Sequence, residues 1–156
     1  MGTNTALYQQ DFYAWTQEQA ALLREGALHD LDATNLAEEI ESLGKSDRRA
    51  LGSHLRNLVL HLLKWHCQPA GRHTGPSWRS SIRNARAEIT VLLDDSPSLR
   101  REVSGLLARW YPLARQDAAD ETVLPLATFP EAYPWTAEQV LDADFWPEAE
   151  TTSASC

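Results

Sequence analysis

The sequence predicts an all-α protein, an antiparallel four-helix bundle-like domain with an ordered, proline-punctuated C-terminal wrap. Three observations lead to this prediction. Apolar residues recur at helical spacing in three long stretches, no stretch alternates as a half-buried strand does, and four of the eight prolines follow residue 120. The length of 156 residues and the hydrophobic content of 43% suit one globular domain. We expect it to span residues 8–147, with flexible termini at 1–7 and 148–156.

The longest helix is predicted over residues 34–66, with Asp32 as its N-cap. At 100° per residue its apolar side chains fall within an arc of about 120°. These are Leu36, Ile40, Leu43, Leu51, Leu55, Leu58, Leu62 and Trp65. We expect the whole stripe to face the core, and we expect Gly44 to bend or split the helix.

Three shorter helices complete the predicted bundle. The first covers residues 11–25, where Asp11 is a suitable N-cap and Gly26 a suitable stop. The third begins after the cap Ser77, and the fourth begins at Pro97 and is perturbed at Pro112.

The C-terminal part is predicted to wrap over the bundle, because a disordered tail would not carry so many aromatic residues. They are Phe129, Tyr133, Trp135, Phe145 and Trp146. Charge supports the same arrangement. Residues 48–87 hold eight basic and no acidic side chains, whereas residues 116–156 hold nine acidic and no basic ones. We therefore expect the acidic segment to cover part of the basic region.

Composition limits the setting of the protein. The net charge of −8 disfavours non-specific DNA binding by the whole surface. Two cysteines do not make a disulfide framework, so a reducing compartment is expected. The N-terminus does not resemble a signal peptide, and no apolar run reaches the ~18 residues of a membrane span. We expect a cytoplasmic protein that does not enter the membrane.

Several sequence blocks resemble the bacterial family known as domain of unknown function 29. The blocks are LAEEIESLGKSDRR (36–49), HLLKW (61–65), SWRSSI (77–82) with Arg86, DSPSLR (95–100), LPLATFPEAYPWT (124–136) and DFWP (144–147). The resemblance covers nearly the whole chain. It implies an all-α fold and a bacterial, cytoplasmic setting, and it implies no activity.

A polar row on the long helix is the first candidate site. Asp47, His54 and His61 are seven residues apart, so the two imidazoles are about 10 Å apart along the helix axis. One metal ion cannot bind both at bond lengths near 2 Å, and we predict neither a metal nor a cofactor.

Arg86 lies on the apolar stripe of the third helix, where a buried guanidinium needs a partner. The facing surface offers no acid, which leaves another part of the chain, another molecule or a bound anion.

The second candidate is a binding surface in which basic residues alternate with indoles, as in nucleic-acid and phosphate recognition. It consists of Lys64, Trp65, Arg72, His73, Trp78 and Arg79. The alternative is that both indoles belong to the core and that the acidic segment partly neutralises the cations.

No catalytic motif stands out, so the sequence favours a non-catalytic protein-interaction module with a protein partner or a second copy of itself. Two alternatives stay open. One is a metal- or anion-binding enzyme of the helical-bundle type that uses His54, His61 and Arg86. The other is a nucleic-acid-associated protein that binds through residues 64–86.

Overall fold

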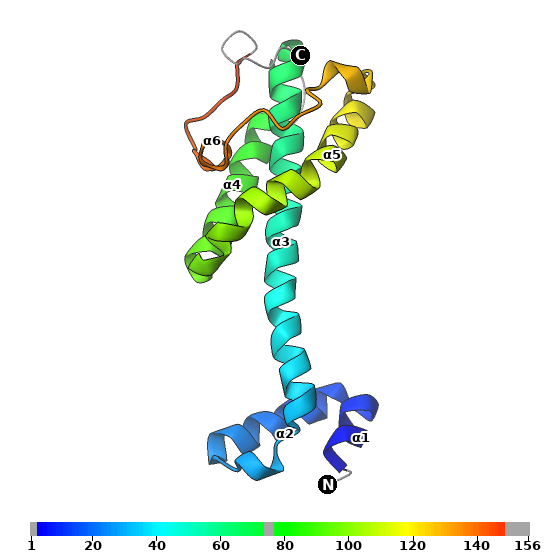
Figure 1. Ribbon diagram of the computed structural model, residues 1–156, viewed down its shortest axis with the longest axis vertical. Helices are drawn as coiled ribbons and strands as arrows, with labels where there is room; N and C mark the ends of the chain where they lie inside the picture. Colours follow the sequence, from blue (N-terminus) through cyan, green and yellow to red (C-terminus); the bar gives the residue numbers. More distant parts are fainter. Residues whose placement is uncertain (1–2, 74–76, 149–156) are drawn as a thin grey trace. The chain divides into compact units, whose positions relative to one another are not determined.

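The computed structural model describes residues 3–73 and 77–148, and within them it contains α-helices and 3-10 helices but no strand. The α-helices are α1 (Thr3–Gln10), α2 (Phe12–Glu25), α3 (Ala33–Cys67), α4 (Trp78–Asp95), α5 (Val103–Thr122) and α6 (Ala137–Leu141), shown in Figure 1. The 3-10 helices are η1 (Leu28–Asp30), η2 (Pro69–His73), η3 (Pro97–Glu102) and η4 (Leu126–Thr128). The predicted all-α class is confirmed.

The chain divides into two compact units, Met1–Ser46 and Asp47–Cys156, which we call the N-terminal unit and the C-terminal unit. Each is described by itself. The single domain predicted over residues 8–147 stays a prediction.

In the N-terminal unit, the helix α1 begins within residues 1–7, whose predicted flexibility stays a prediction. Beyond that segment, Tyr8 packs edge-on against Trp15 of α2 with ring centroids 4.8 Å apart. The Tyr8 hydroxyl also donates a hydrogen bond to Glu39 of α3. Neither contact can be read from the local sequence of α1.

The connection from α2 to α3 is fixed by Asp32. Its Oδ2 accepts from the indole Nε1 of Trp15 at 3.1 Å, and its amide donates to Gln19 Oε1 at 2.8 Å. Its carboxylate also accepts from the side chain of Asn35 at 2.7 Å, which is the main reason that the pKa of Asp32 is lowered. Asp32 Oδ1 also accepts from the backbone amide of Asn35 at 3.4 Å, so Asp32 caps α3 as predicted and ties it to α2.

The helix α3 runs unbroken for 35 residues, so the predicted split at Gly44 is wrong. One glycine costs a helix only about 1 kcal/mol and leaves its hydrogen bonds in place. The prediction that the whole apolar stripe is buried is also wrong. Leu51, Leu55, Leu58 and Leu62 are fully buried, but Ile40 and Leu43 in the earlier part of the stripe are exposed.

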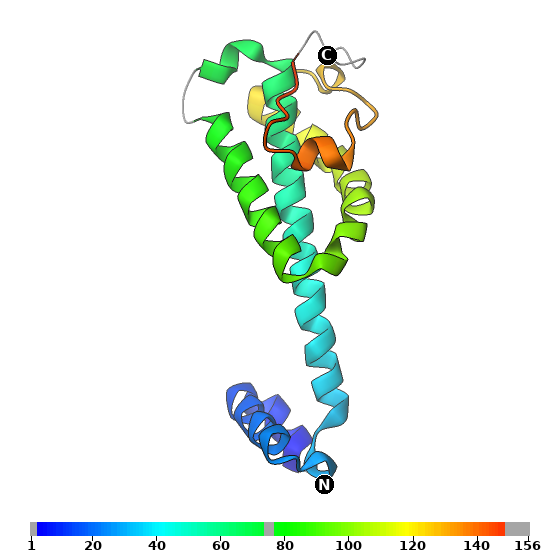
Figure 2. The same ribbon diagram turned by 90° about the vertical axis from the view of Figure 1, so that its left-hand side faces the viewer.

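In the C-terminal unit, α4 and α5 pack with the later part of α3 around one hydrophobic core (Figure 2). The predicted cap Ser77 is confirmed by its bond from the Ser80 amide at 3.2 Å. Pro97 begins η3, and α5 starts only at Val103. Pro112 does not end α5, because buried residues on both sides hold the helix in the core.

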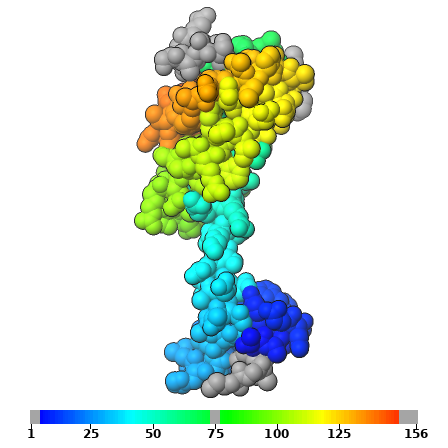
Figure 3. All heavy atoms as spheres, turned by 45° about the vertical axis from the view of Figure 1, so that its right-hand side comes forward, coloured from blue at the N-terminus to red at the C-terminus, as the bar shows by residue number. Residues whose placement is uncertain are grey.

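The segment after α5 lies across this core as an ordered layer, which confirms the predicted C-terminal wrap. Phe129, Trp135 and Val140 are almost completely buried. Thr136 and Gln139 form the reciprocal cap that starts α6. Figure 3 shows this segment, in orange, against the helices of the same unit.

Candidate functional site

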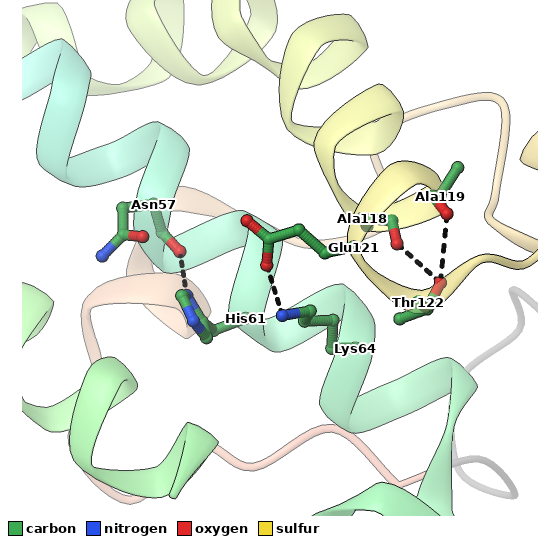
Figure 4. Close-up of polar contacts among 7 residues, drawn as sticks. All are labelled: Asn57, His61, Lys64, Ala118, Ala119, Glu121 and Thr122. Atoms are coloured by element: carbon green, nitrogen blue, oxygen red, sulfur yellow. Dashed lines mark hydrogen bonds and ion pairs between the residues drawn. The ribbon is translucent and has the colours of Figure 1, made fainter. Parts of the chain in front are cut away.

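Four of the eight basic residues in the 48–87 stretch form ion pairs within the described part of the C-terminal unit. Arg56 binds Asp117 through two hydrogen bonds, from Nε at 2.7 Å and from Nη2 at 2.9 Å. Lys64, which is buried, pairs with Glu121 (Figure 4). Asp117 follows Arg56 by 61 residues and Glu121 follows Lys64 by 57 residues, so part of the separation of charge along the sequence disappears on folding.

Arg86 is buried and is bound by the C-terminal segment. Its Nε donates to the carbonyl of Val140 at 2.9 Å, and its Nη2 donates to the carbonyl of Phe145 at 2.8 Å. The guanidinium also lies over the ring of Trp146 at 5.5 Å. Burial lowers the pKa of Arg86, and the charge of Asp142 opposes this effect. Of the three partners left open by the sequence, these contacts identify another part of the same chain.

The predicted binding surface is also occupied by the C-terminal segment. Arg72 and Arg79 lie over the ring of Trp65 at 5.0 and 5.5 Å, and Trp146 packs against the same ring at 4.9 Å. Arg72 further donates to Glu148 at 3.0 Å. The interleaved cations and indoles therefore form an internal stack.

The two remaining members of that surface lie beside the stack. Trp78, the first residue of α4, is half-buried, and the ammonium of Lys64 lies 5.5 Å from its ring centroid. His73 is the last residue of η2, and its side chain lies outside the described part of the structure.

The polar row does not converge on one point. Asp47 is exposed, His54 is half-buried, and His61 bonds the carbonyl of Asn57 on its own helix at 2.8 Å (Figure 4). Because a carbonyl only accepts, Nδ1 of His61 carries the proton, and burial lowers the pKa of this ring. Within residues 3–73 and 77–148 there is no group of three His, Cys, Asp or Glu side chains able to hold a metal ion.

An apolar surface that the sequence analysis missed lies in the N-terminal unit, between α2 and the first part of α3. We call it the N-terminal groove, and its volume is about 420 Å³. Its apolar lining comes from Phe12, Trp15, Ala20 and Leu23 of α2 and from Leu36, Ile40 and Leu43 of α3. Ile40 is 66% exposed and Leu43 is 68% exposed, so the walls of the groove are open to solvent.

Three polar side chains, those of Thr16, Gln19 and Glu39, also line the groove. Glu39 accepts a hydrogen bond from the Tyr8 hydroxyl, a bond that raises the pKa of Tyr8. Gln19 is 1% exposed, and its oxygen is held by the Asp32 amide. The groove therefore combines broad apolar contact with one positioned carboxylate.

The length of the helices is the signal that could have revealed this groove. The predicted stripe on the long helix extends over about 30 residues, whereas α4 and α5 contain 18 and 20 residues. Because each residue adds about 1.5 Å in any α-helix, α4 or α5 packed along α3 covers only part of the length of the stripe.

The fold and surfaces described above define an all-helical protein with an internally paired basic region and an open apolar groove. The family described as "Domain of unknown function DUF29" matches residues 7–146, and the chain belongs to this family. Comparisons with curated proteins and with solved structures found no match. In the described part of the chain, no helix has both the length and the hydrophobicity needed to cross a bilayer.

Proposed function

We propose that the protein is a non-catalytic interaction module that binds an amphipathic helix of a partner protein in the N-terminal groove. As the family resemblance implies, we place this activity in the bacterial cytoplasm. The observation that carries the proposal is the exposure of Ile40 and Leu43 on the helical stripe that, further along α3, forms the core.

The shape of the groove favours a helix as the occupant. Two helices form its walls, and the lining residues of α2 extend from Phe12 to Leu23, which is about 16 Å along the axis. This length accommodates about three turns of a partner helix. Helices bind such grooves through apolar anchors at positions i, i+3, i+4 and i+7.

The expected gain on binding is substantial. Ile40 and Leu43 are about two-thirds exposed, as measured above, and complete burial of such a side chain contributes about 1.5–3 kcal/mol. We therefore assign about 1–2 kcal/mol to each of these two residues. Small molecules of similar volume are a less suitable class, because the walls do not enclose a ligand.

The contacts in the C-terminal unit favour this proposal over the two alternatives. Arg86 binds backbone carbonyls, and His61 binds its own helix, so neither meets the other in the manner of a catalytic pair. Lys64 and Arg72 pair with carboxylates. Cations engaged in this way have less charge to offer to a nucleic acid.

The proposal can be tested by selecting helical 20-residue peptides from a displayed library on the full-length protein. In this library every peptide has apolar residues at the same helical spacing, and all other positions are randomised. We expect binders whose affinity falls at least tenfold in the Ile40→Gln and Leu43→Gln variants, since about 1.4 kcal/mol corresponds to a factor of ten. Both residues are exposed, so these variants should fold normally.

The matched control is Val91→Gln, since Val91 is also an exposed apolar residue, at 55%, but lies on α4 outside the groove. Selection of no groove-dependent peptide would refute the proposal. Equal loss of binding in the control variant would refute it as well.

A further inference from the structure

We infer that the partner helix carries lysine or arginine residues beside its apolar stripe, and that Glu39 is the residue that pairs with one of them. This inference rests on the proposed function, because it names the chemical class of helix that the N-terminal groove binds. It follows from the charge of the N-terminal unit and from the position of Glu39 within the groove.

The N-terminal unit has a strong excess of negative charge. Residues 1–46 contain eight acidic side chains and two basic ones, a net charge of −6. A charge of this size raises the local concentration of basic partners and speeds their association, and the effect weakens as salt is added. A helix with neutral or acidic flanks would gain no such attraction.

Glu39 gives this general attraction a specific point of contact. Its carboxylate is among the residues that line the groove, and the Tyr8 hydroxyl holds one of its oxygens. The surrounding walls are apolar, and a bound helix would exclude water from them. A charge pair is stronger where water is excluded, so an ammonium or guanidinium beside Glu39 should add to both affinity and register.

The same charges argue against a second copy of the chain as the occupant. Two N-terminal units meeting through their grooves would bring together two net charges of −6 and would place the two Glu39 carboxylates in one apolar interface. Like charges in such an interface oppose association. A different protein with a basic amphipathic helix avoids this cost.

The test compares two 18-residue helical peptides with the same leucine stripe, one with lysine flanks and one with glutamine flanks. Binding to the full-length protein is measured by fluorescence anisotropy in about 20 mM salt and in about 500 mM salt. We expect the lysine peptide to bind at least tenfold more tightly at low salt and to lose most of that advantage at high salt, where the screening length is only a few ångströms. Glu39→Gln should reduce the advantage by about three- to tenfold, and its amide oxygen can still accept from Tyr8.

Glu38→Gln is the matched control, because it removes the same charge from the neighbouring residue, which does not line the groove. Equal effects of the two variants would overturn the role of Glu39.

If both peptides bind equally and still depend on Ile40 and Leu43, the charge inference fails while the proposed function stands. If neither peptide binds, the proposed function fails too. A dimer in solution that Ile40→Gln dissociates would identify a second copy as the occupant and would overturn the inference.

Discussion

Replacing Arg86 with methionine should strongly destabilise the C-terminal unit, because this side chain joins α4 to the C-terminal segment. The guanidinium donates to the carbonyls of Val140 and Phe145, which are 54 and 59 residues away in the sequence. Methionine fills a similar volume without a donor. The substitution therefore removes both hydrogen bonds while keeping most of the packing.

The magnitude follows from the groups that lose their partners. A buried acceptor left without a donor costs about 1–3 kcal/mol, and two carbonyls are affected. The contact with the Trp146 ring contributes about 0.5–2 kcal/mol more. Relief from burying the charge offsets part of this loss, and Nη1 has no acceptor in the described structure. We expect a net loss of about 2–4 kcal/mol, equivalent to a fall in Tm of roughly 5–15 °C for a chain of this length.

Thermal and urea unfolding followed by circular dichroism measure this loss. Arg83→Met is the control, because Arg83 is an exposed arginine on the same helix and should tolerate the change within about 0.5 kcal/mol. Equal stability of Arg86→Met and the wild type would refute the view that these two bonds hold the C-terminal segment. Equal destabilisation in both variants would refute it as well.

Two further predictions concern α3. Gly44→Ala should stabilise the protein by up to about 1 kcal/mol through helix propensity, since nothing lies within 4 Å of the added Cβ. Gly52→Ala places the added Cβ 2.6 Å from Nε1 of Trp110. In urea unfolding, this variant should be less stable than Gly44→Ala by about 1–3 kcal/mol. Equal stability of the two variants would contradict this prediction. Burial lowers the pKa of the His61 imidazole, so the unfolded chain binds a proton at this ring more readily than the folded protein does. The free energy of unfolding should therefore fall as the pH drops through about 6.5. His61→Gln should reduce this pH dependence in unfolding experiments between pH 5 and 8. A slope unchanged by the substitution would contradict the assignment.

Local features of the fold could be predicted because their causes lie within a few residues. Asp11 accepts from the Ala14 amide at 3.0 Å, and Gly26 adopts a φ of 72° as a helix stop requires. The reciprocal bonds of Thr136 and Gln139 follow from the same short-range chemistry. A capping side chain needs only its own helix as a partner, which is why the sequence is sufficient.

The partner of Arg86 could not be predicted by the same means. The sequence indicated no acid on the facing surface and left open another part of the chain, another molecule or a bound anion as the partner. Backbone carbonyls are present at every residue, however, so no pattern marks Val140 and Phe145 as the acceptors. The ordered C-terminal segment could be predicted from its aromatic residues, but its bonds to this arginine required the structure.

The exposed part of the α3 stripe could not be predicted because burial is a property of neighbours. Ile40 and Leu55 occupy the same kind of position in a helical pattern, yet one is 66% exposed and the other is fully buried. What differs is whether other helices lie against that stretch. Periodicity indicates which face of a helix is apolar, and only the arrangement of the other elements determines how much of that face is covered.

The distribution of charge and apolar surface between the two units gives the strongest reason to look for the function in the N-terminal unit. Residues 47–156 hold 12 basic and 14 acidic side chains, a net charge of −2, and at least four of the basic ones form ion pairs within that unit. Residues 1–46 contribute the remaining net charge of −6, and they also present the exposed walls of the N-terminal groove. The C-terminal unit therefore cancels its charges and buries its apolar stripe within itself, whereas the N-terminal unit leaves both exposed. Apolar surface beside uncompensated charge is what a partner of opposite charge and matching apolar face would cover. Four cations of the basic region thus pair within the fold, and the proposed function places recognition in the first 46 residues of the chain.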